Sequence, residues 1–240
     1  MKAFLLIALL LCVFPLRAAV VLIDPGHGGD EFGAVGMLDK FRKVMEKDLS
    51  LRLAKKIQEK LRATTSVYLT RSLDRTVGLQ ERADMADKLK ADLFISVHFN
   101  SSTDPAAHGF ETYYLDNNKD GAVRKVEKQE NFSLKGDDQV VNQILIDLAI
   151  QQTVKSSRAL ALEVHGRLKS FMKPTGMANR GVKAGLFYVL ALSKRPGLLL
   201  EAGFVSNSAE LKKIQLDEFM GRYASGVALG VKEFLKTQKK

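Results

Sequence analysis

Short apolar segments of strand length alternate with amphipathic segments of helix length along most of the chain. The segment at residues 92–99 is almost continuously apolar, as is typical of a strand covered on both faces. Similar but shorter segments lie at residues 20–23, 67–69, 110–115, 186–190 and 198–201. This alternation predicts a single α/β domain at residues 19–240, with a central, mostly parallel sheet of about six strands and helices on both faces.

The amphipathic segments predict the helices of that domain. From Leu49 to Leu61 an aliphatic residue recurs at every fourth position, which is the spacing of a helix with one buried face. Residues 116–138 differ, because they are charged and have only a weak apolar pattern, and we interpret them as an insertion on the surface. The other predicted helices cover residues 79–89, 140–153, 157–171, 210–214 and 219–235.

Composition excludes several classes of protein. With 37 basic and 27 acidic side chains among 240 residues, the net charge is +10, which favours an anionic partner. The 13 Phe and 5 Tyr residues, without any Trp, give no sign of an aromatic surface for nucleic acid. A disulfide framework is excluded because Cys12 is the only cysteine.

The first residues predict a secretory signal sequence. Lys2 precedes an apolar run at residues 3–14, which is shorter than the roughly 20 residues that span a bilayer. The small residues Ala18 and Ala19 follow, so we interpret residues 1–18 as a signal peptide. A buried first strand or helix is the alternative.

Three chemically reactive side chains occur where predicted strands end. His27 lies in the turn after residues 20–23, His98 ends the strand at 92–99, and Glu201 ends the strand at 198–201. Ligands of open α/β sheets bind at the carboxyl ends of strands, so we expect these three side chains at one edge. Two imidazoles and a carboxylate buried together are costly unless they bind a cation or one another. If the partner is a cation, this donor set suits Zn²⁺.

A catalytic zinc site needs a third protein ligand and keeps its fourth position open. Glu46, just before the predicted helix that contains Leu49, is the best acidic candidate. Its alternative role is a favourable interaction with the helix dipole, and the residue pattern alone leaves both readings open.

Seven segments, in chain order, resemble a known family. They are VVLIDPGHGG, MEKDLSLRLAKKI, LTRSLDRTVGLQERADMA, ADLFISVHFNSS, GFETYYL, NRGVKAGLFYVL and LLLEAGFVSN, and they run from about Val20 to the end of the chain. Together they resemble the zinc-dependent N-acetylmuramoyl-L-alanine amidases of the bacterial cell wall.

The resemblance implies roles for the four residues. His27, Glu46 and His98 are expected to bind one zinc ion per chain, and Glu201 is expected to be the catalytic carboxylate. The implied reaction is hydrolysis of the amide bond between N-acetylmuramic acid and L-alanine in peptidoglycan. His108 and His165 fall on no ligand position of the family.

Three further residues are candidates for supporting roles. Asp24 and Asn100 flank ligand positions and are candidates to orient a ligand. Arg71 follows a strand and is a candidate for contact with a stem-peptide carboxylate, with an ion pair to Asp74 or Glu81 as its alternative.

The insertion at 116–138 raises the question of control. Some members of the family carry a helical segment here that blocks the metal until an activator protein removes it. Glu127 or Glu130 is then the candidate for an inhibitory zinc ligand. A solvated charged loop that binds anionic wall polymer is the alternative.

Two other functions compete with the amidase. One is a zinc peptidase that cuts within the stem peptide, and the other is an inactive wall-binding module or an activator. We expect a monomeric, exported protein that binds peptidoglycan and no nucleic acid. The periplasm is the expected location, with secretion or wall association as the alternative.

Overall fold

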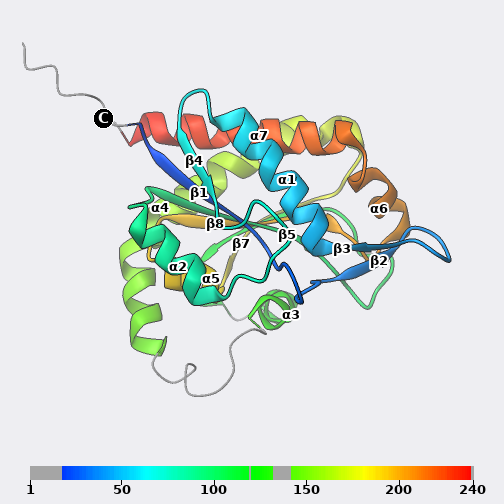
Figure 1. Cartoon of the computed structure of the whole chain (residues 1–240), viewed down its shortest axis with the longest axis horizontal. Helices are drawn as coiled ribbons and strands as arrows, with labels where there is room; N and C mark the ends of the chain where they lie inside the picture. Colours follow the sequence, from blue (N-terminus) through cyan, green and yellow to red (C-terminus); the bar gives the residue numbers. More distant parts are fainter. Residues whose placement is uncertain (1–17, 119, 132–141, 239–240) are drawn as a thin grey trace, which may run out of the picture.

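A computed structural model describes residues 18–118, 120–131 and 142–238 of the chain. Its centre is a six-stranded sheet with the strand order β4-β1-β5-β8-β6-β7 (Figure 1). Apart from Ala18, the expected signal sequence at 1–18 lies outside the described residues. The six strands are β1 (Val20–Pro25), β4 (Ser66–Leu69), β5 (Leu93–Asn100), β6 (Phe110–Leu115), β7 (Asn179–Gly185) and β8 (Gly197–Phe204).

The sheet is mostly parallel, as predicted, and its direction changes only once. Strands β4, β1, β5 and β8 are parallel, whereas β6 is antiparallel to β8 and carries β7 parallel to itself. The carboxyl ends of β1, β5 and β8 therefore share one edge with the amino ends of β6 and β7. In the register, His98 lies opposite Glu201 and Glu201 lies opposite Glu111, so these three side chains form a row on one face.

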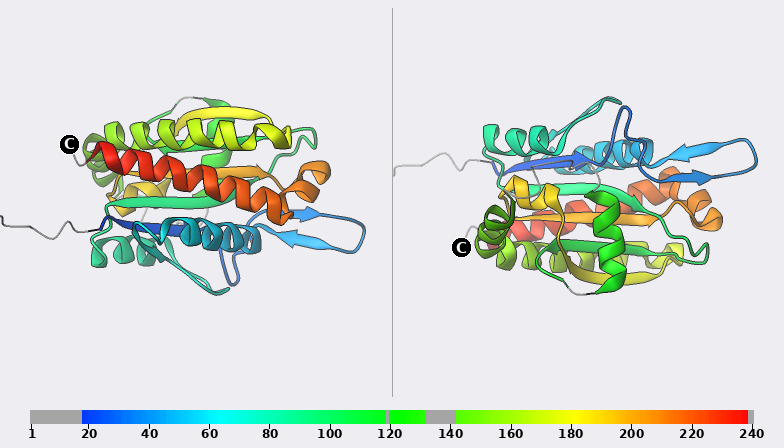
Figure 2. Two further views of the ribbon diagram at one scale, coloured as in Figure 1. Left: turned by 90° about the horizontal axis from the view of Figure 1, so that it is seen from above. Right: turned by 90° about the horizontal axis from the view of Figure 1, so that it is seen from below.

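Helices cover both faces of the sheet, which confirms the predicted architecture (Figure 2). Side chains such as Ile95 and Val97 pack in one apolar cluster with α1, α7 and the later part of α4. Their neighbour Phe94 points the other way, into a second cluster with α2, α3 and α5. The helices are α1 (Glu46–Leu61), α2 (Leu79–Lys88), α3 (Gly121–Glu130), α4 (Asn142–Met172), α5 (Tyr188–Ser193), α6 (Ser208–Ile214) and α7 (Asp217–Thr237), with a 3₁₀ turn at Lys173–Thr175.

One long helix replaces the two that the sequence predicts at 140–153 and 157–171. Helix α4 continues through both ranges, because the junction contains neither Gly nor Pro. Its first half buries Ile146 and Ala149 in the second apolar cluster, whereas its second half buries Leu160 and Val164 in the first. The apolar side thus differs between the two halves of one helix. In the sequence, this change of pattern resembles the boundary between two helices.

The strand predicted at 186–190 is also wrong. The short helix α5 begins there at Tyr188, with Phe187 as its N-cap, and the strand β7 comes earlier, over Asn179–Gly185. A short apolar run does not by itself distinguish a buried strand from a buried helix. The real strand lies at the edge of the sheet and is only half-buried, so it lacks an apolar pattern.

Part of the predicted surface insertion at 116–138 forms helix α3, which packs against the domain (Figure 1). Asp120 caps the helix by accepting a hydrogen bond from the backbone N–H of Ala122 at 2.8 Å. Val123 and Val126, one turn apart, are buried in the second apolar cluster. Residues 119 and 132–138 of the insertion lie outside the described residues.

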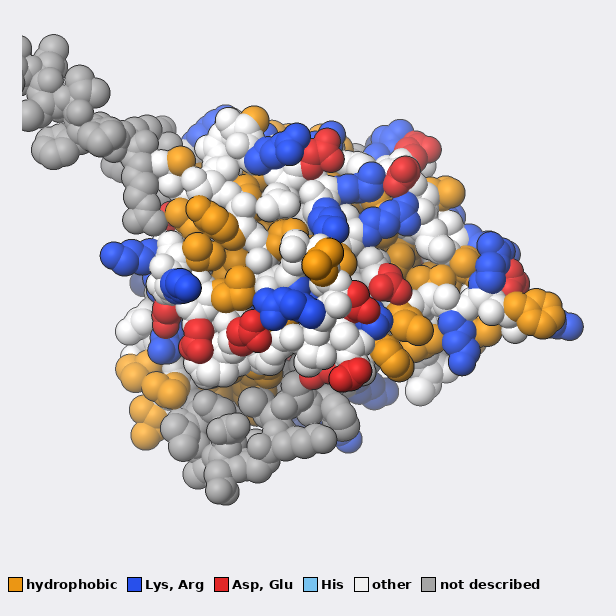
Figure 3. Space-filling view, in the orientation of Figure 1, with side chains coloured by type: hydrophobic (Ala, Val, Ile, Leu, Met, Phe, Trp, Pro, Cys, Tyr) orange, Lys and Arg blue, Asp and Glu red, His pale blue; other side chains and the backbone are white. Residues whose placement is uncertain are grey.

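A β-hairpin that the sequence analysis does not predict joins the turn after β1 to α1. It consists of β2 (Val35–Met37) and β3 (Lys43–Met45), and Phe41 at its tip is 92% exposed. The hairpin protrudes on the right of Figure 3, where exposed apolar and basic side chains lie together. Among the described helices, none is long and apolar enough to cross a membrane.

Candidate active site

The three predicted ligand residues meet, although they come from different elements. His27 lies in the turn after β1, Glu46 is the first residue of α1, and His98 lies on β5. The turn brings its backbone so close to His98 that a Cβ atom at Gly26 would lie 2.3 Å from the imidazole ring. His27 itself has a φ of 58°, which is uncommon for a residue with a side chain. The chain is therefore bent tightly to place one imidazole beside the other.

Glu46 lies between the two imidazoles. Its Oε2 atom is 3.1 Å from His27 Nε2, and its Oε1 atom is 3.0 Å from His98 Nδ1. The same carboxylate accepts hydrogen bonds from the backbone N–H groups of Ala34 at 2.8 Å and Phe99 at 3.0 Å. These backbone contacts hold the carboxylate in one orientation.

A fourth residue, Glu130 at the end of α3, completes the cluster. Its Oε2 atom is 2.7 Å from His98 Nδ1 and 3.5 Å from His27 Nε2. The ligand atoms of His27, Glu46, His98 and Glu130 all lie within 4.8 Å of one another. Of the two acidic residues that the sequence left open, Glu130 reaches the cluster. Glu127 instead accepts a hydrogen bond from the backbone N–H of Leu186 at 2.6 Å.

The cluster fits a metal ion. Zinc bound at about 2.0–2.2 Å in a tetrahedron places its ligand atoms about 3.3–3.6 Å apart, close to the spacing of these four side chains. Although His27 Nε2 and Glu130 Oε2 are buried and near charged neighbours, neither makes a hydrogen bond within the described part of the chain. Buried polar atoms that converge without hydrogen bonds are expected where a cation is the shared partner.

The electrostatics of the cluster agree with this interpretation. Burial alone would raise the pKa of Glu46, but His27 and His98 hold that pKa far below its ordinary value. Burial alone would lower the pKa of His98, but Glu130 and Glu46 raise it well above the ordinary value. The carboxylates of Glu46 and Glu130 are thus stabilised by positive charge nearby. Protons on the imidazoles or a bound cation can provide that charge.

Glu201 lies beside this cluster on β8 and is completely buried. Neither of its carboxyl oxygens has a hydrogen-bond partner among the described residues. Burial raises its pKa well above the ordinary value, and the nearby Glu130 raises it further. A shift in this direction favours the protonated form of the carboxyl group, as is typical of a general acid.

A second polar group continues the row beyond Glu201, and the sequence analysis missed it. Glu111 on β6 is 1% exposed and receives a hydrogen bond from Lys183 at 2.8 Å and others from Arg180 and Tyr113. The search for polar residues at carboxyl ends of strands overlooks this group, because β6 and β7 begin at this edge. The signal that locates Glu111 is the change of strand direction between β8 and β6, which is seen in the structure.

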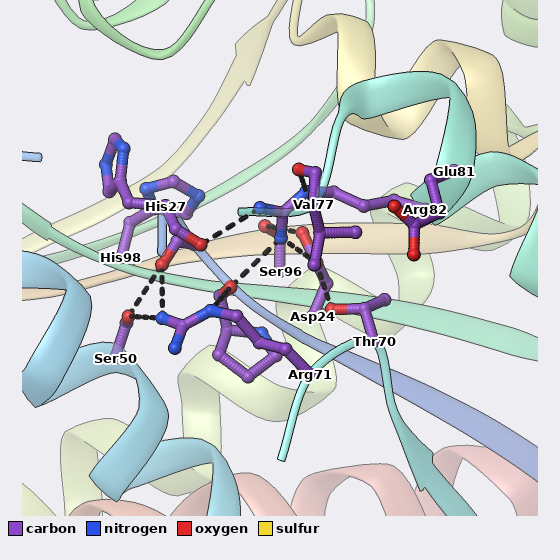
Figure 4. Close-up of polar contacts among 12 residues, drawn as sticks. Asp24, His27, Ser50, Thr70, Arg71, Val77, Glu81, Arg82, Ser96 and His98 are labelled. Atoms are coloured by element: carbon purple, nitrogen blue, oxygen red, sulfur yellow. Dashed lines mark hydrogen bonds and ion pairs between the residues drawn. The ribbon is translucent and has the colours of Figure 1, made fainter. Parts of the chain in front are cut away.

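Asp24 does not contact a ligand side chain directly. It accepts hydrogen bonds from Thr70 at 2.6 Å and Ser96 at 3.0 Å and forms a buried ion pair with Arg82 (Figure 4). Arg82 in turn donates to the backbone carbonyl of His27 at 3.0 Å. Asp24 therefore supports the turn that carries His27, through Arg82.

Arg71 has a similar structural position behind the turn, where it is 1% exposed. Its side chain is buried and donates to the carbonyls of Gly26 at 2.7 Å and Lys47 at 2.8 Å (Figure 4). The ion pairs considered as its alternative are made by other residues, since Lys47 pairs with Asp74 and Arg75 pairs with Glu81.

Asn100, His108 and His165 are not among the four clustered residues. The Asn100 side chain accepts from the N–H of Ser101 at 2.7 Å and lines a cavity next to Glu111. His165 is buried between Thr112 and Asn179, and His108 is exposed, with its ring 2.7 Å from the carbonyl of Ala106. These positions agree with the expectation that neither histidine is a ligand.

The comparison with known families decides what this arrangement belongs to. The family model described as N-acetylmuramoyl-L-alanine amidase matches residues 21–233, which include all four clustered residues and Glu201. The chain belongs to this amidase family.

Curated relatives in the amidase family share just under a third of the sequence. The chain is 28% identical to N-acetylmuramoyl-L-alanine amidase LytC of Bacillus subtilis (strain 168), over 92% of this chain and 36% of LytC. It is 30% identical to N-acetylmuramoyl-L-alanine amidase AmiA of Escherichia coli (strain K12), over 88% of this chain and 74% of AmiA. The chain thus spans about a third of the first relative and about three quarters of the second.

Solved structures of amidases share the fold. An N-acetylmuramoyl-L-alanine amidase from Clostridium difficile 630 matches with a TM-score of 0.71 and 29% identity, over 92% of this chain and 98% of that one. The catalytic domain of CwlV, an N-acetylmuramoyl-L-alanine amidase from Bacillus (Paenibacillus) polymyxa, matches with a TM-score of 0.63 and 30% identity, over 91% and 98%. The amidase match therefore covers the sheet, the helices and the edge at which the polar residues meet.

Proposed function

We propose that this protein is a zinc-dependent hydrolase of the amide bond between N-acetylmuramic acid and L-alanine in peptidoglycan. One observation carries the proposal. Two imidazoles and two carboxylates converge within 4.8 Å, next to a buried carboxyl group that has no hydrogen-bond partner in the described structure. Membership of the amidase family supports the substrate.

His27, Glu46 and His98 are the residues that would hold the zinc ion. Each comes from the sheet edge or from the start of α1, so each is fixed by the scaffold of the domain. When bound, Zn²⁺ acts as a Lewis acid that polarises the scissile carbonyl and lowers the pKa of water. The backbone N–H groups that fix Glu46 keep this ligand from rotating away.

Glu201 would move the proton. It is placed to accept a proton from the attacking water and to donate it to the nitrogen of L-alanine as that nitrogen leaves. Its raised pKa suits the first step, because the carboxylate then holds a proton taken from water more strongly than an exposed glutamate does. Because neither carboxyl oxygen of Glu201 has a hydrogen-bond partner among the described residues, no such bond there competes with the transfer of the proton.

Glu130 would control access to the metal. Its carboxylate lies where the fourth ligand of a tetrahedral site is expected, which is the position that water needs. Val123 and Val126 hold α3 against the domain, and the Glu127 contact with Leu186 adds a second attachment. We therefore propose that α3 inhibits the enzyme until a partner protein moves it away.

An amidase with this substrate acts outside the cytoplasmic membrane. We propose export directed by residues 1–18 and a periplasmic location. Cell fractionation tests this location. Protein found in the medium or bound to the wall would contradict a periplasmic location.

Digestion of purified peptidoglycan tests the proposed reaction. The products released by the chain and by its Glu130→Ala variant are identified by mass spectrometry, and bound metal is measured by elemental analysis. Free stem peptides that begin with L-alanine, together with one zinc per chain, support the proposal. Cuts within the stem peptide would show a peptidase instead, and intact peptidoglycan from both proteins would indicate a binding module.

A further inference from the structure

A cavity of about 430 Å³ is lined by Glu111, the residue paired with Glu201 on the neighbouring strand, and therefore lies beyond Glu201 in the order of the strands. Strands β6 and β7 form its polar wall, where Glu111, Arg180 and Lys183 are in contact. Phe204 adds an apolar surface, and Lys125 on α3 contributes a further positive charge at the rim. None of the roles described above uses this cavity.

A β-bulge in β7 places both cations on the same face as Glu111. Phe110 is paired with Asn179 and Thr112 with Val182, so Arg180 and Gly181 together lie opposite the single residue Glu111. In a regular strand, residues three apart point to opposite faces, and the extra residue of the bulge corrects this. Gly181 accommodates the bulge with a φ of 84°.

Arg180 is held in one orientation by contacts that leave its terminal amino groups available. Its Nε–H donates to Glu111, and its guanidinium group lies over the ring of Phe204, 5.1 Å from the ring centre. No hydrogen bond from its two terminal nitrogens is found among the described residues. A fixed guanidinium with two such nitrogens is suited to bind a carboxylate through two hydrogen bonds.

The charge of the cluster also favours an anion. Burial alone would raise the pKa of Glu111, but Lys183 and the other donors around it lower it, so this carboxylate is charged. One negative and two positive side chains leave a surplus positive charge, and both cations lie on β7, which does not depend on the position of α3. Arg180 and Lys183 are 36% and 24% exposed, so a ligand in the cavity can reach them.

The order of strands relates this cavity to the reaction. Metal ligands lie on β5 and after β1, Glu201 follows on β8, and the cation cluster comes next on β6 and β7. If Glu201 donates a proton to the leaving nitrogen, the peptide half of the substrate extends past Glu201 toward β6 and β7. The cavity is the space that this half would enter.

We propose that Arg180, assisted by Lys183, binds a carboxylate of the stem peptide on the L-alanine side of the scissile bond. This inference rests on the proposed amidase function and deepens it, because it assigns the recognition of the leaving peptide. It also places at Arg180 the role that the sequence analysis considered for Arg71.

Binding of two synthetic ligands tests the proposal. One is N-acetylmuramoyl-L-alanyl-D-glutamate, and the other is the same compound with both carboxylates converted to carboxamides. Calorimetry is performed on zinc-loaded chain carrying Glu130→Ala and Glu201→Gln, so that α3 does not exclude the ligand and no cleavage occurs. We expect the acid to bind at least about tenfold more tightly than the diamide, as is typical of hydrogen bonds between charged groups.

Variants of this protein identify the residue responsible. Adding Arg180→Ala should reduce the preference for the acid to less than about twofold, whereas Arg180→Lys should retain part of it because the charge remains. Adding Arg222→Ala, on the exposed surface of α7, should leave the preference unchanged. Thermal unfolding verifies that each variant is folded.

The inference is overturned if the parent binds both compounds equally or binds neither, or if folded Arg180→Ala keeps the full preference. Failure of the amidase proposal gives a different result, since the Glu130→Ala chain with Glu201 intact would then release no L-alanine-terminated peptides from peptidoglycan.

Discussion

Two groups of buried charged side chains lie on either side of the His27 turn, and they differ in how well their polar atoms are satisfied. Behind the turn, Asp24 accepts a hydrogen bond from the Thr70 side chain, and Arg71 and Arg82 donate hydrogen bonds to backbone carbonyls of the turn (Figure 4). In front of it, atoms of His27, Glu130 and Glu201 have no hydrogen-bond partner among the described residues.

The difference separates residues that support the fold from residues that act. A buried polar group without a hydrogen bond costs about 1–3 kcal/mol, so such groups are expected to persist where function requires them. A fully bonded buried group stabilises the surrounding chain. Burial alone therefore does not identify a functional residue, whereas burial without a hydrogen-bond partner among the described residues, next to the His27–Glu130 cluster, supports the role proposed for Glu201.

The largest expected effect concerns Glu201, on the unsatisfied side. Glu201→Gln should lower the rate of peptidoglycan hydrolysis by about 10²–10⁴-fold, because the proton carrier is lost. Its zinc content and melting temperature should stay at wild-type values, since the carboxyl group makes no hydrogen bond in the described structure. Turnover assays, metal analysis and calorimetry measure the three quantities.

Glu163→Gln is the matched control for this variant, because Glu163 is an exposed partner of Arg167 on α4. It should leave the rate unchanged. A Glu201→Gln protein that retained full hydrolysis would remove the assigned role.

Arg82 belongs to the hydrogen-bonded group behind the His27 turn. Its substitution should lower the stability of the fold without acting directly on the rate of hydrolysis. Arg82→Ala leaves the buried carboxylate of Asp24 without its charged partner and removes donors to the carbonyls of Pro25 and His27. We expect the free energy of unfolding to fall by about 3–5 kcal/mol, as for other broken buried ion pairs. Urea denaturation measures the change.

Arg222→Ala is the comparison for Arg82→Ala, because Arg222 forms an exposed ion pair with Glu218. Such pairs contribute about 0–1 kcal/mol. Equal losses from the two variants would contradict the contrast drawn between the two sides of the turn.

The same buried pair predicts a dependence of stability on pH. Burial alone would raise the pKa of Asp24, but Arg82 and Thr70 lower it below its ordinary value. A carboxylate with a lowered pKa stabilises the folded state above the unfolded-state pKa of about 3.9, and this contribution disappears as the pH falls through the folded-state value.

The difference in unfolding free energy between wild type and Asp24→Asn should therefore be constant near neutral pH and shrink below about pH 4. Urea denaturation over a pH series measures it. A difference that grows in acid would show that the pKa of Asp24 is not lowered.

The smallest effect is expected at Glu130, where the unsatisfied side meets helix α3. Glu130→Ala should raise basal hydrolysis by at least about fivefold, since a regulatory contact of this kind contributes roughly 1–3 kcal/mol. Lys128→Ala, on the exposed face of α3, should not change the rate. Unchanged activity of Glu130→Ala would count against inhibition by α3.

Much of the scaffold could be predicted from the sequence because its signals are local. The apolar run at 92–99 is strand β5, and the fourfold spacing from Leu49 to Leu61 is helix α1. The predictions fail where the environment changes along one element, as in α4, or where an edge strand such as β7 lacks an apolar pattern. In both cases the burial is decided by distant parts of the chain.

By itself the sequence determined the α/β architecture and placed His27, His98 and Glu201 toward one edge of the sheet, because strand periodicity shows in consecutive residues. It ended the last strand too early, since β8 continues past Glu201 to Phe204. Only the tertiary structure decided that Glu130 rather than Glu127 faces the imidazoles, since this depends on how α3 packs against Leu186. The tertiary structure also decided that Arg180 donates a hydrogen bond to Glu111, whereas Arg71 is buried. A reversed strand direction and a β-bulge bring the first pair together, and neither is visible as a local pattern.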